Sequence, residues 1–175
     1  MKTKQLALCG LFSALMVICA WISLPFGDSP FTLQTFGLFL CLGALGGKCG
    51  TISVITYLLL GMVGFPAFSG FRGGIGALLD VTGGYLVGFL VAALLYWLIT
   101  SVLTPSPTVR LFSMILGLLS CYIFGTVWFW AVYAQTDPVT LPLVLIKCVL
   151  PYLLPDAMKL LLAWQLSGRL SKFIN

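Results

Sequence analysis

The sequence predicts an all-α membrane protein whose six transmembrane helices form one bundle. Hydrophobic residues make up 61% of the 175 residues and charged residues only 7%, whereas about 25% of a typical soluble domain is charged. The mean hydropathy is +1.14. So few polar groups cannot cover a soluble core, and so apolar a chain is not disordered. Six spans of roughly 20 residues would use about 120 residues, so we expect residues 1–175 to form a single six-helix transmembrane domain.

Prolines, glycines and polar residues divide the chain into apolar runs. Five of these runs are typical of spans: 5–24, 32–46, 49–65, 82–103 and 110–134. The last stretch, 139–167, is too long for one span and contains three prolines. Because proline favours the first turn of a helix, we expect the sixth span to begin near Pro155 and to end near Lys172. Residues 139–150 are then a short extra half-helix before it.

The distribution of charge predicts the orientation in the membrane. An even number of spans places both termini on one side, and that side collects six basic residues and no acid: Lys2, Lys4, Lys48, Arg110, Arg169 and Lys172. The other side collects Asp28, Asp80 and Asp137, with Arg72 as its clear base. This excess of positive charge predicts cytoplasmic termini. The longer loops, around 25–30, 68–80 and 135–151, are then external, where we expect recognition.

The residue types exclude several kinds of activity. The chain has no His and no Glu, and therefore lacks most common metal ligands and general bases. No GxxxxGK[ST] segment is present, so a P-loop ATPase is excluded. The basic residues are scattered singly at the ends of apolar runs, which argues against a nucleic-acid partner. We therefore expect no enzyme, no catalytic residues, no cofactor and no bound metal.

Two charges lie inside the expected sixth span. Asp156 and Lys159 are three residues apart and therefore share a helix face, with Lys159 roughly 8 Å along the axis from the expected start. A charge at such depth costs about 2.5–3.5 kcal/mol on insertion scales and usually faces a cavity or a partner. The pair is either a structural ion pair or the polar wall of a ligand pocket, and we favour the pocket.

Other candidate site residues lie near the expected external loops. Arg72 and Gly73 belong to a glycine-rich segment whose backbone can approach another group closely. Arg72 would face an anionic ligand or remain an ordinary solvated charge. Gln34, near the start of the second span, would contact a ligand or form a helix–helix hydrogen bond. Most aromatic residues fall near span ends, as in an interfacial belt, but Tyr85 and Trp128 are candidates for the pocket.

The first span carries a stripe of small residues, which lets another helix approach closely. It comprises Ala7, Gly10, Ser13 and Ala14. The stripe serves internal packing or a separate membrane subunit. Together, these features favour an external, partly polar pocket for a small amphiphilic ligand that has a carboxylate and a hydrogen-bonding head.

Four separated segments, taken in order, resemble the BioY family, the biotin-binding S components of energy-coupling factor transporters. The segments are 29–35 (SPFTLQT), 57–68 (YLLLGMVGFPAF), 82–89 (TGGYLVGF) and 155–159 (PDAMK). The resemblance covers nearly the whole chain. It implies a multi-pass protein of the cell membrane that captures biotin at the external face. It also implies partners in the lipid bilayer: a transmembrane coupling subunit and two ATPase subunits, which energise an ABC-type vitamin importer.

The same resemblance implies roles for individual residues. Asp156 and Lys159 occupy the positions of the family's acid and lysine, which contact the bicyclic head of biotin. Arg72 stands where family members can carry an amide, and its guanidinium is directed toward the biotin carboxylate. Asp80 and Val81 replace a Gly-Pro of the family, which leaves the role of Asp80 open. The alternatives are an S component for another vitamin, a structural membrane subunit and an intramembrane enzyme.

Overall fold

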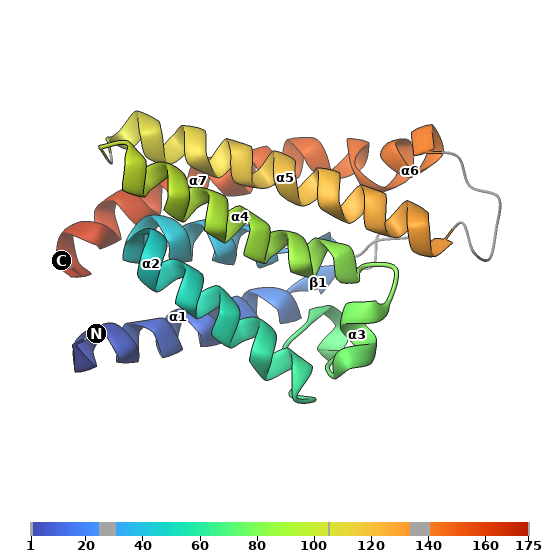
Figure 1. Cartoon of the computed structure of the whole chain (residues 1–175), viewed down its shortest axis with the longest axis horizontal. Helices are drawn as coiled ribbons and strands as arrows, with labels where there is room; N and C mark the ends of the chain where they lie inside the picture. Colours follow the sequence, from blue (N-terminus) through green and yellow to red (C-terminus); the bar gives the residue numbers. More distant parts are fainter. Residues whose placement is uncertain (1, 25–30, 105, 134–140, 175) are drawn as a thin grey trace.

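The computed structural model describes residues 2–24, 31–104, 106–133 and 141–174, and most of these residues are helical. In chain order the elements are α1 (Thr3–Trp21), β1 (Ser23–Leu24), β2 (Phe31–Thr32), α2 (Gln34–Met62), the 3-10 helix η1 (Ser69–Phe71), α3 (Ile75–Leu79), α4 (Gly83–Val102), α5 (Pro107–Tyr133), α6 (Leu141–Cys148) and α7 (Leu150–Ile174). The helices form an elongated bundle with both termini at one end (Figure 1). There, the ammonium of Lys4 donates a hydrogen bond to the carbonyl of Ile174 at 2.6 Å.

Four of the described helices are long and apolar enough to cross a membrane. They are α1, α2, α4 and residues Pro107–Val132 of α5. Large apolar side chains are exposed on their outer faces, and Leu11, Leu98 and Ile123 are 63%, 60% and 67% exposed. A water-soluble monomer rarely exposes such continuous apolar surface, whereas lipid solvates it. The expectation of a helical membrane protein is therefore confirmed.

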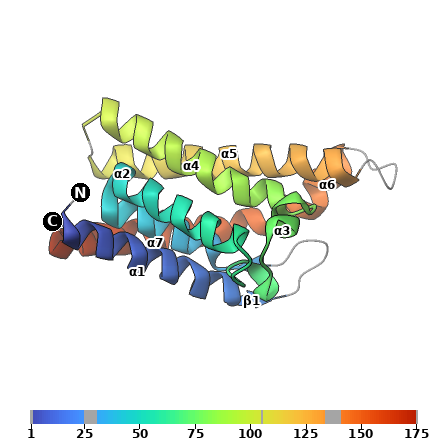
Figure 2. The ribbon, with the colours of Figure 1, turned by 60° about the horizontal axis from the view of Figure 1, so that its bottom comes forward.

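Helix α2 consists of two arms that meet at Gly46. This glycine has φ 78° and ψ 173°, a conformation outside the helical region. A Cβ built on Gly50 would lie 3.0 Å from Leu42 Cα, although eight residues of a continuous helix span about 12 Å. The chain therefore reverses at Gly46, and residues 34–45 and 47–62 run side by side (Figures 1 and 2). These arms correspond to the second and third apolar runs of the sequence.

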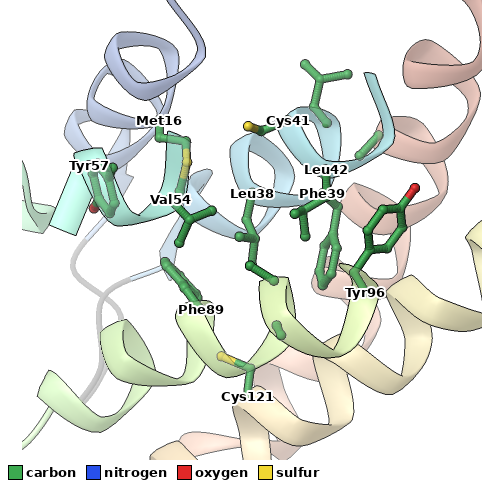
Figure 3. Close-up of a cluster of buried hydrophobic side chains, with 14 of the residues drawn as sticks. Met16, Leu38, Phe39, Cys41, Leu42, Val54, Tyr57, Phe89, Tyr96 and Cys121 are labelled. Carbon is green, nitrogen blue, oxygen red and sulfur yellow. The ribbon is translucent and has the colours of Figure 1, made fainter. Parts of the chain in front are cut away.

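The two arms of α2 lie at the centre of the main core. Figure 3 shows side chains of both arms meeting those of α1, α4 and α5 in one cluster: Met16, Leu38, Phe39, Val54, Phe89 and Cys121. Leu38 and Val54 are completely buried. This packing holds the first arm of α2, which carries Gln34 and Thr35, in place against the rest of the bundle.

Glycines bring α4 and α5 close together. A Cβ on Gly84 would lie 2.2 Å from Trp128 Cβ, and one on Gly125 would lie 2.2 Å from the ring of Tyr85. Small residues permit this approach between membrane helices, whose association depends on van der Waals packing. The contact fixes Tyr85, a predicted site residue, relative to α5.

The segment before the last helix differs from the prediction. The expected half-helix is present as α6, but α7 begins at Leu150, and Pro155 lies inside it rather than at its start. Pro151 occupies the first turn, where a missing N–H costs nothing. Pro155 then removes only the hydrogen bond to the carbonyl of Pro151, a loss that neighbouring groups in a bundle can offset. Asp156 consequently lies in the second turn of α7.

The end of α1 also differs from the prediction. The helix stops at Trp21, and Ser23–Leu24 pairs with Phe31–Thr32 as a two-stranded antiparallel ribbon. The sequence did not suggest this ribbon. The proline-rich loop at 25–30 and the loop at 135–138, with Asp28 and Asp137, lie outside the described residues.

We expect Gly84→Ala to lower the free energy of unfolding by about 1–3 kcal/mol, because the added methyl group overpacks the contact with Trp128. The matched control is Gly168→Ala, whose Cβ would meet nothing within 4 Å. Thermal unfolding of both variants in detergent measures the effect. Equal melting temperatures would show that α4 and α5 do not depend on this close approach.

Candidate functional site

Residues of β2, of the start of α2, of the segment around η1, and of α4, α5, α6 and α7 line a cavity. Figure 1 shows α3 and α6, which lie next to these segments, at the end of the bundle remote from the termini. The first arm of α2, helices α4, α5 and α7, and Cys148 of α6 surround the cavity, and Thr32 of β2 and the segment around η1 complete its lining, with the exposed Arg72 at its mouth. The space not filled by atoms is about 760 Å³, the open mouth included. Five of the predicted site residues line it: Gln34, Arg72, Tyr85, Asp156 and Lys159.

A buried ion pair forms one wall of the cavity. Lys159 Nζ lies 2.8 Å from Asp156 Oδ1, and the two side chains are 8% and 7% exposed. The spacing of three residues on α7 brings them together, as predicted from the sequence. The two interpretations of this pair are compatible, because the residues form a salt bridge with each other and also line the cavity.

The carboxylate of Asp156 receives two further hydrogen bonds from other helices. Thr35 Oγ1 in the first arm of α2 donates to Oδ1 at 2.9 Å. The hydroxyl of Tyr122 in α5 donates to Oδ2 at 2.6 Å. Hydrogen bonds to a charged acceptor are stronger than neutral ones, so these donors stabilise the ionised acid within an apolar bundle.

The ammonium of Lys159 is held by the β ribbon. Nζ donates to the carbonyl of Thr32 at 2.6 Å and lies 3.8 Å from the centroid of the Phe31 ring. A cation over an aromatic face is attracted by the ring quadrupole, more strongly where water is excluded. Strand β2 therefore compensates the cost of placing this amine between helices.

Gln34 joins the two arms of α2 beside the ion pair. Its Nε2 donates to the hydroxyl of Tyr57 at 2.6 Å, and its Oε1 accepts from Thr32 Oγ1 at 3.0 Å. The helix–helix hydrogen bond considered for this amide is therefore present, and Gln34 also lines the cavity.

Arg72 lies at the mouth of the cavity and is anchored on three sides. Its guanidinium pairs with the carboxylate of Asp80, donates to Thr82 Oγ1 at 3.2 Å and donates to the carbonyl of Ser69 at 3.3 Å. The Arg72 and Asp80 side chains are 44% and 39% exposed, so solvent screens the pair. Asp80, whose role the sequence left open, is the carboxylate that orients Arg72.

Tyr85 brings a buried hydroxyl to the cavity. Its oxygen forms no hydrogen bond of good geometry among the described residues, and the same is true of the Thr126 hydroxyl in α5, which lies close enough to interact with it. The Tyr85 hydroxyl can therefore bind a polar group in the cavity. Apolar side chains of α4 and α5 continue this wall, namely Leu86, Phe89 and Leu118.

Two predicted site residues, Trp128 and Gly73, do not line the cavity. The indole N–H of Trp128 donates to the carbonyl of Asp80 at 3.1 Å, so this side chain supports the rim from behind. A Cβ at Gly73 would lie 2.2 Å from the carbonyl oxygen of Phe65. The glycine therefore serves a close backbone contact within the loop, and a contact between Gly73 and a ligand stays a prediction.

Sequence reasoning missed several residues of the site. Thr35 and Tyr122 solvate Asp156, while Phe31 and Thr32 hold Lys159. One signal was available, since a tyrosine in the middle of an apolar span needs a partner for its hydroxyl. The roles of Phe31 and Thr32 depend on the ribbon, which no local pattern indicated.

The arrangement can bind a polar group that both donates and accepts hydrogen bonds. Asp156 offers acceptor oxygens and Lys159 offers N–H groups, 2.8 Å apart on one wall. The neighbouring wall is apolar, and a cation lies at the mouth. Such a cavity fits a small ligand with a polar head, an apolar body and an anionic end.

Comparison with known proteins places the chain among transporters. The family model for the BioY family matches residues 1–175. A probable biotin transporter BioY of Pyrococcus horikoshii is 36% identical over 170 residues, covering 97% of this chain and 98% of that protein. The biotin transporter BioY of Thermotoga maritima is 52% identical over 90 residues, and this match spans 51% of the chain and 53% of that protein, about half its length.

A solved structure has the same fold along almost the whole chain. It is the S-component for biotin from an ECF-type ABC transporter, with a TM-score of 0.83 and 26% sequence identity, covering 98% of this chain and 95% of that one. The resemblance drawn from the four sequence segments is thus confirmed, as is the expectation of a transport protein rather than an enzyme. The match of the whole chain to the family model, together with the Pyrococcus relative, shows that the chain belongs to the BioY family.

Proposed function

We propose that this chain is the high-affinity biotin-binding membrane subunit of an energy-coupling factor importer. The observation that carries the proposal is the Asp156–Lys159 pair, buried between helices yet lining a cavity. Charges at such a position are costly and usually mark a substrate site. Membership of the BioY family and the likeness to the S-component for biotin support the same substrate.

The proposed topology has six spans: α1, the two arms of α2, α4, α5 and α7. Six of the nine basic residues belong to the end of the bundle that carries the termini. The positive-inside bias supports a cytoplasmic location for that end. The cavity then opens toward the external face, where a vitamin arrives.

The proposed pose places the ureido ring of biotin against α7. Asp156 accepts hydrogen bonds from the ureido N–H groups, and Lys159 donates to the ureido oxygen. The sulfur ring and the aliphatic chain lie along the apolar wall formed by Leu86 and Phe89. The carboxylate reaches the mouth, where Arg72 supplies a guanidinium.

The proposed transport cycle requires partners. Biotin enters from outside, the external loops close over it, and the bundle docks on a transmembrane coupling subunit and tilts to expose the site inward. Two ATPase subunits reset the cycle. The small residues of α1 support docking only in part: Ala7, Gly10 and Ala14 are exposed, but Ser13 is buried and donates to the carbonyls of Cys9 and Ser53, each at 2.8 Å.

Replacing both Asp156 and Lys159 by Ala should weaken biotin binding by about a hundredfold or more, because two charged hydrogen-bonding partners of the ligand are lost. Equilibrium binding of labelled biotin to purified protein measures the effect, with Lys172→Ala on the exposed end of α7 as the control. Unchanged affinity in the double variant would refute the site assignment. Competition by other vitamins in the same assay tests the alternative substrate.

Arg72→Gln should weaken the binding of biotin by about tenfold but leave the uncharged biotin methyl ester unaffected, because only the acid has a carboxylate for the guanidinium. Asp80→Asn is the control, since it removes the competing carboxylate and keeps the cation. An equal loss for both ligands would assign Arg72 a structural role only.

Gly10→Leu should abolish biotin uptake by the assembled importer and leave biotin binding by the isolated subunit intact. A Cβ at Gly10 meets nothing within 4 Å, so a larger side chain fits in the isolated chain and obstructs only a helix docked from outside. Gly168→Leu is the matched control on α7. Normal uptake by Gly10→Leu would exclude this face of α1 as the docking surface.

A further inference from the structure

We propose that a second cavity, at the end of the bundle that carries the termini, binds the phosphate group of an anionic phospholipid. The turn of α2 at residues 43–48, the end of α4, Arg110 near the start of α5 and Ser171 of α7 surround it. Its unfilled space is about 900 Å³, open mouth included. It shares no lining residue with the first cavity, so this site is separate from the proposed biotin site and does not depend on it.

Two cations that form no ion pair with any described residue line this cavity. Lys48 and Arg110 both belong to its lining. Within the described ranges, the ion pairs are Arg72–Asp80 and Lys159–Asp156. Both pairs lie at the first cavity or its rim. The two remaining acids of the sequence, Asp28 and Asp137, belong to the segments that follow β1 and α5. The described part of the second cavity thus has positive charge and no acid to neutralise it.

Arg110 has an unmet hydrogen-bonding requirement. Its Nε is buried and has no partner among the described residues. The hydroxyls that line the cavity donate to helix carbonyls, Thr100 to Tyr96 at 2.7 Å, Ser101 to Leu98 at 2.8 Å and Ser171 to Gly168 at 3.2 Å, and among the described residues none of them accepts a hydrogen bond from this Nε. A buried guanidinium N–H without an acceptor is costly. A phosphate group has several anionic oxygens that match the guanidinium geometry.

The backbone contributes helix ends of both polarities to the cavity. The second arm of α2 begins at Gly47, after the break at Gly46, and its first N–H groups and dipole favour negative charge. The last turns of the first arm of α2 and of α4 also line the space and present the opposite end of the dipole. The preference for an anion therefore comes from the side chains of Lys48 and Arg110.

The apolar surroundings favour a lipid as the source of the phosphate. Trp97 lines the cavity and is 39% exposed, as expected for an indole at the membrane interface. Leu94 and Leu98, on the same helix, are 47% and 60% exposed, so acyl chains can lie along α4 while the headgroup occupies the cavity. Basic pockets between membrane helices on the cytoplasmic side are known to bind anionic headgroups.

The test is native mass spectrometry of the full chain released from micelles that contain equal amounts of phosphatidylglycerol and phosphatidylcholine. We expect wild type to retain phosphatidylglycerol at least about tenfold more than phosphatidylcholine, and Arg110→Gln to lose about tenfold of that retention, as for one charged hydrogen-bonded contact. Arg169→Gln is the matched control, since it removes the same charge from an exposed residue near the same end. Biotin binding, measured in parallel, reports that each variant is folded.

Equal retention of phosphatidylglycerol by Arg110→Gln and Arg169→Gln would overturn the proposal, as would the absence of a lipid preference in wild type. If Arg110→Gln does not fold, Lys48→Gln and the wild-type preference still decide the question. Inorganic phosphate distinguishes the source: stabilisation of wild type by phosphate at millimolar concentration, with no preference between the lipids, would identify a free anion instead and refute the lipid.

Discussion

The buried salt bridge between Asp156 and Lys159 in α7 is the interaction that several separate parts of the fold stabilise. An acid and an amine inside an apolar bundle are stable only if nearby groups replace the water that they lose. Here Thr35 and Tyr122 donate to the carboxylate, and the Thr32 carbonyl and the Phe31 ring hold the ammonium. These partners come from α2, α5 and β2, so the pair ties three separate parts of the chain to α7.

The elements that supply these partners depend on two local departures from helical geometry. The reversal at Gly46 returns α2 along itself and allows Gln34 and Tyr57, 23 residues apart, to form a hydrogen bond beside the site. The ribbon of β1 and β2 turns the chain back after α1 and brings Phe31 over Lys159. Without the reversal at Gly46, the cavity would lose the wall formed by the first arm of α2. Without the ribbon, the ammonium of Lys159 would lose the groups that compensate its burial.

The bundle has contrasting ends. At one end, each cation that lines the cavity has an acid within bonding distance, and the hollow between them suits a neutral head with an anionic tail. At the other, Lys48 and Arg110 line a hollow without a described counter-ion. The two ends therefore differ in charge, since the cations of one are paired with acids and the cations of the other are not paired with any described acid.

Composition alone was sufficient to predict a helical membrane protein, because lipid exposure demands an apolar surface wherever a helix lies. Spacing was sufficient to pair Asp156 with Lys159, because residues three apart share a helix face whatever the surroundings. Local patterns could not predict hydrogen bonds between distant residues. Asp156 accepts hydrogen bonds from Thr35, 121 residues away in the sequence, and from Tyr122, 34 residues away. The start of α7 lies at Leu150, ahead of Pro155, because Pro151 can occupy the first turn, and the indole of Trp128 donates to the Asp80 carbonyl, a contact between separate segments that its own helix does not reveal. A local pattern constrains a residue's neighbours on its own helix, whereas contacts between helices depend on how closely their small residues let them approach.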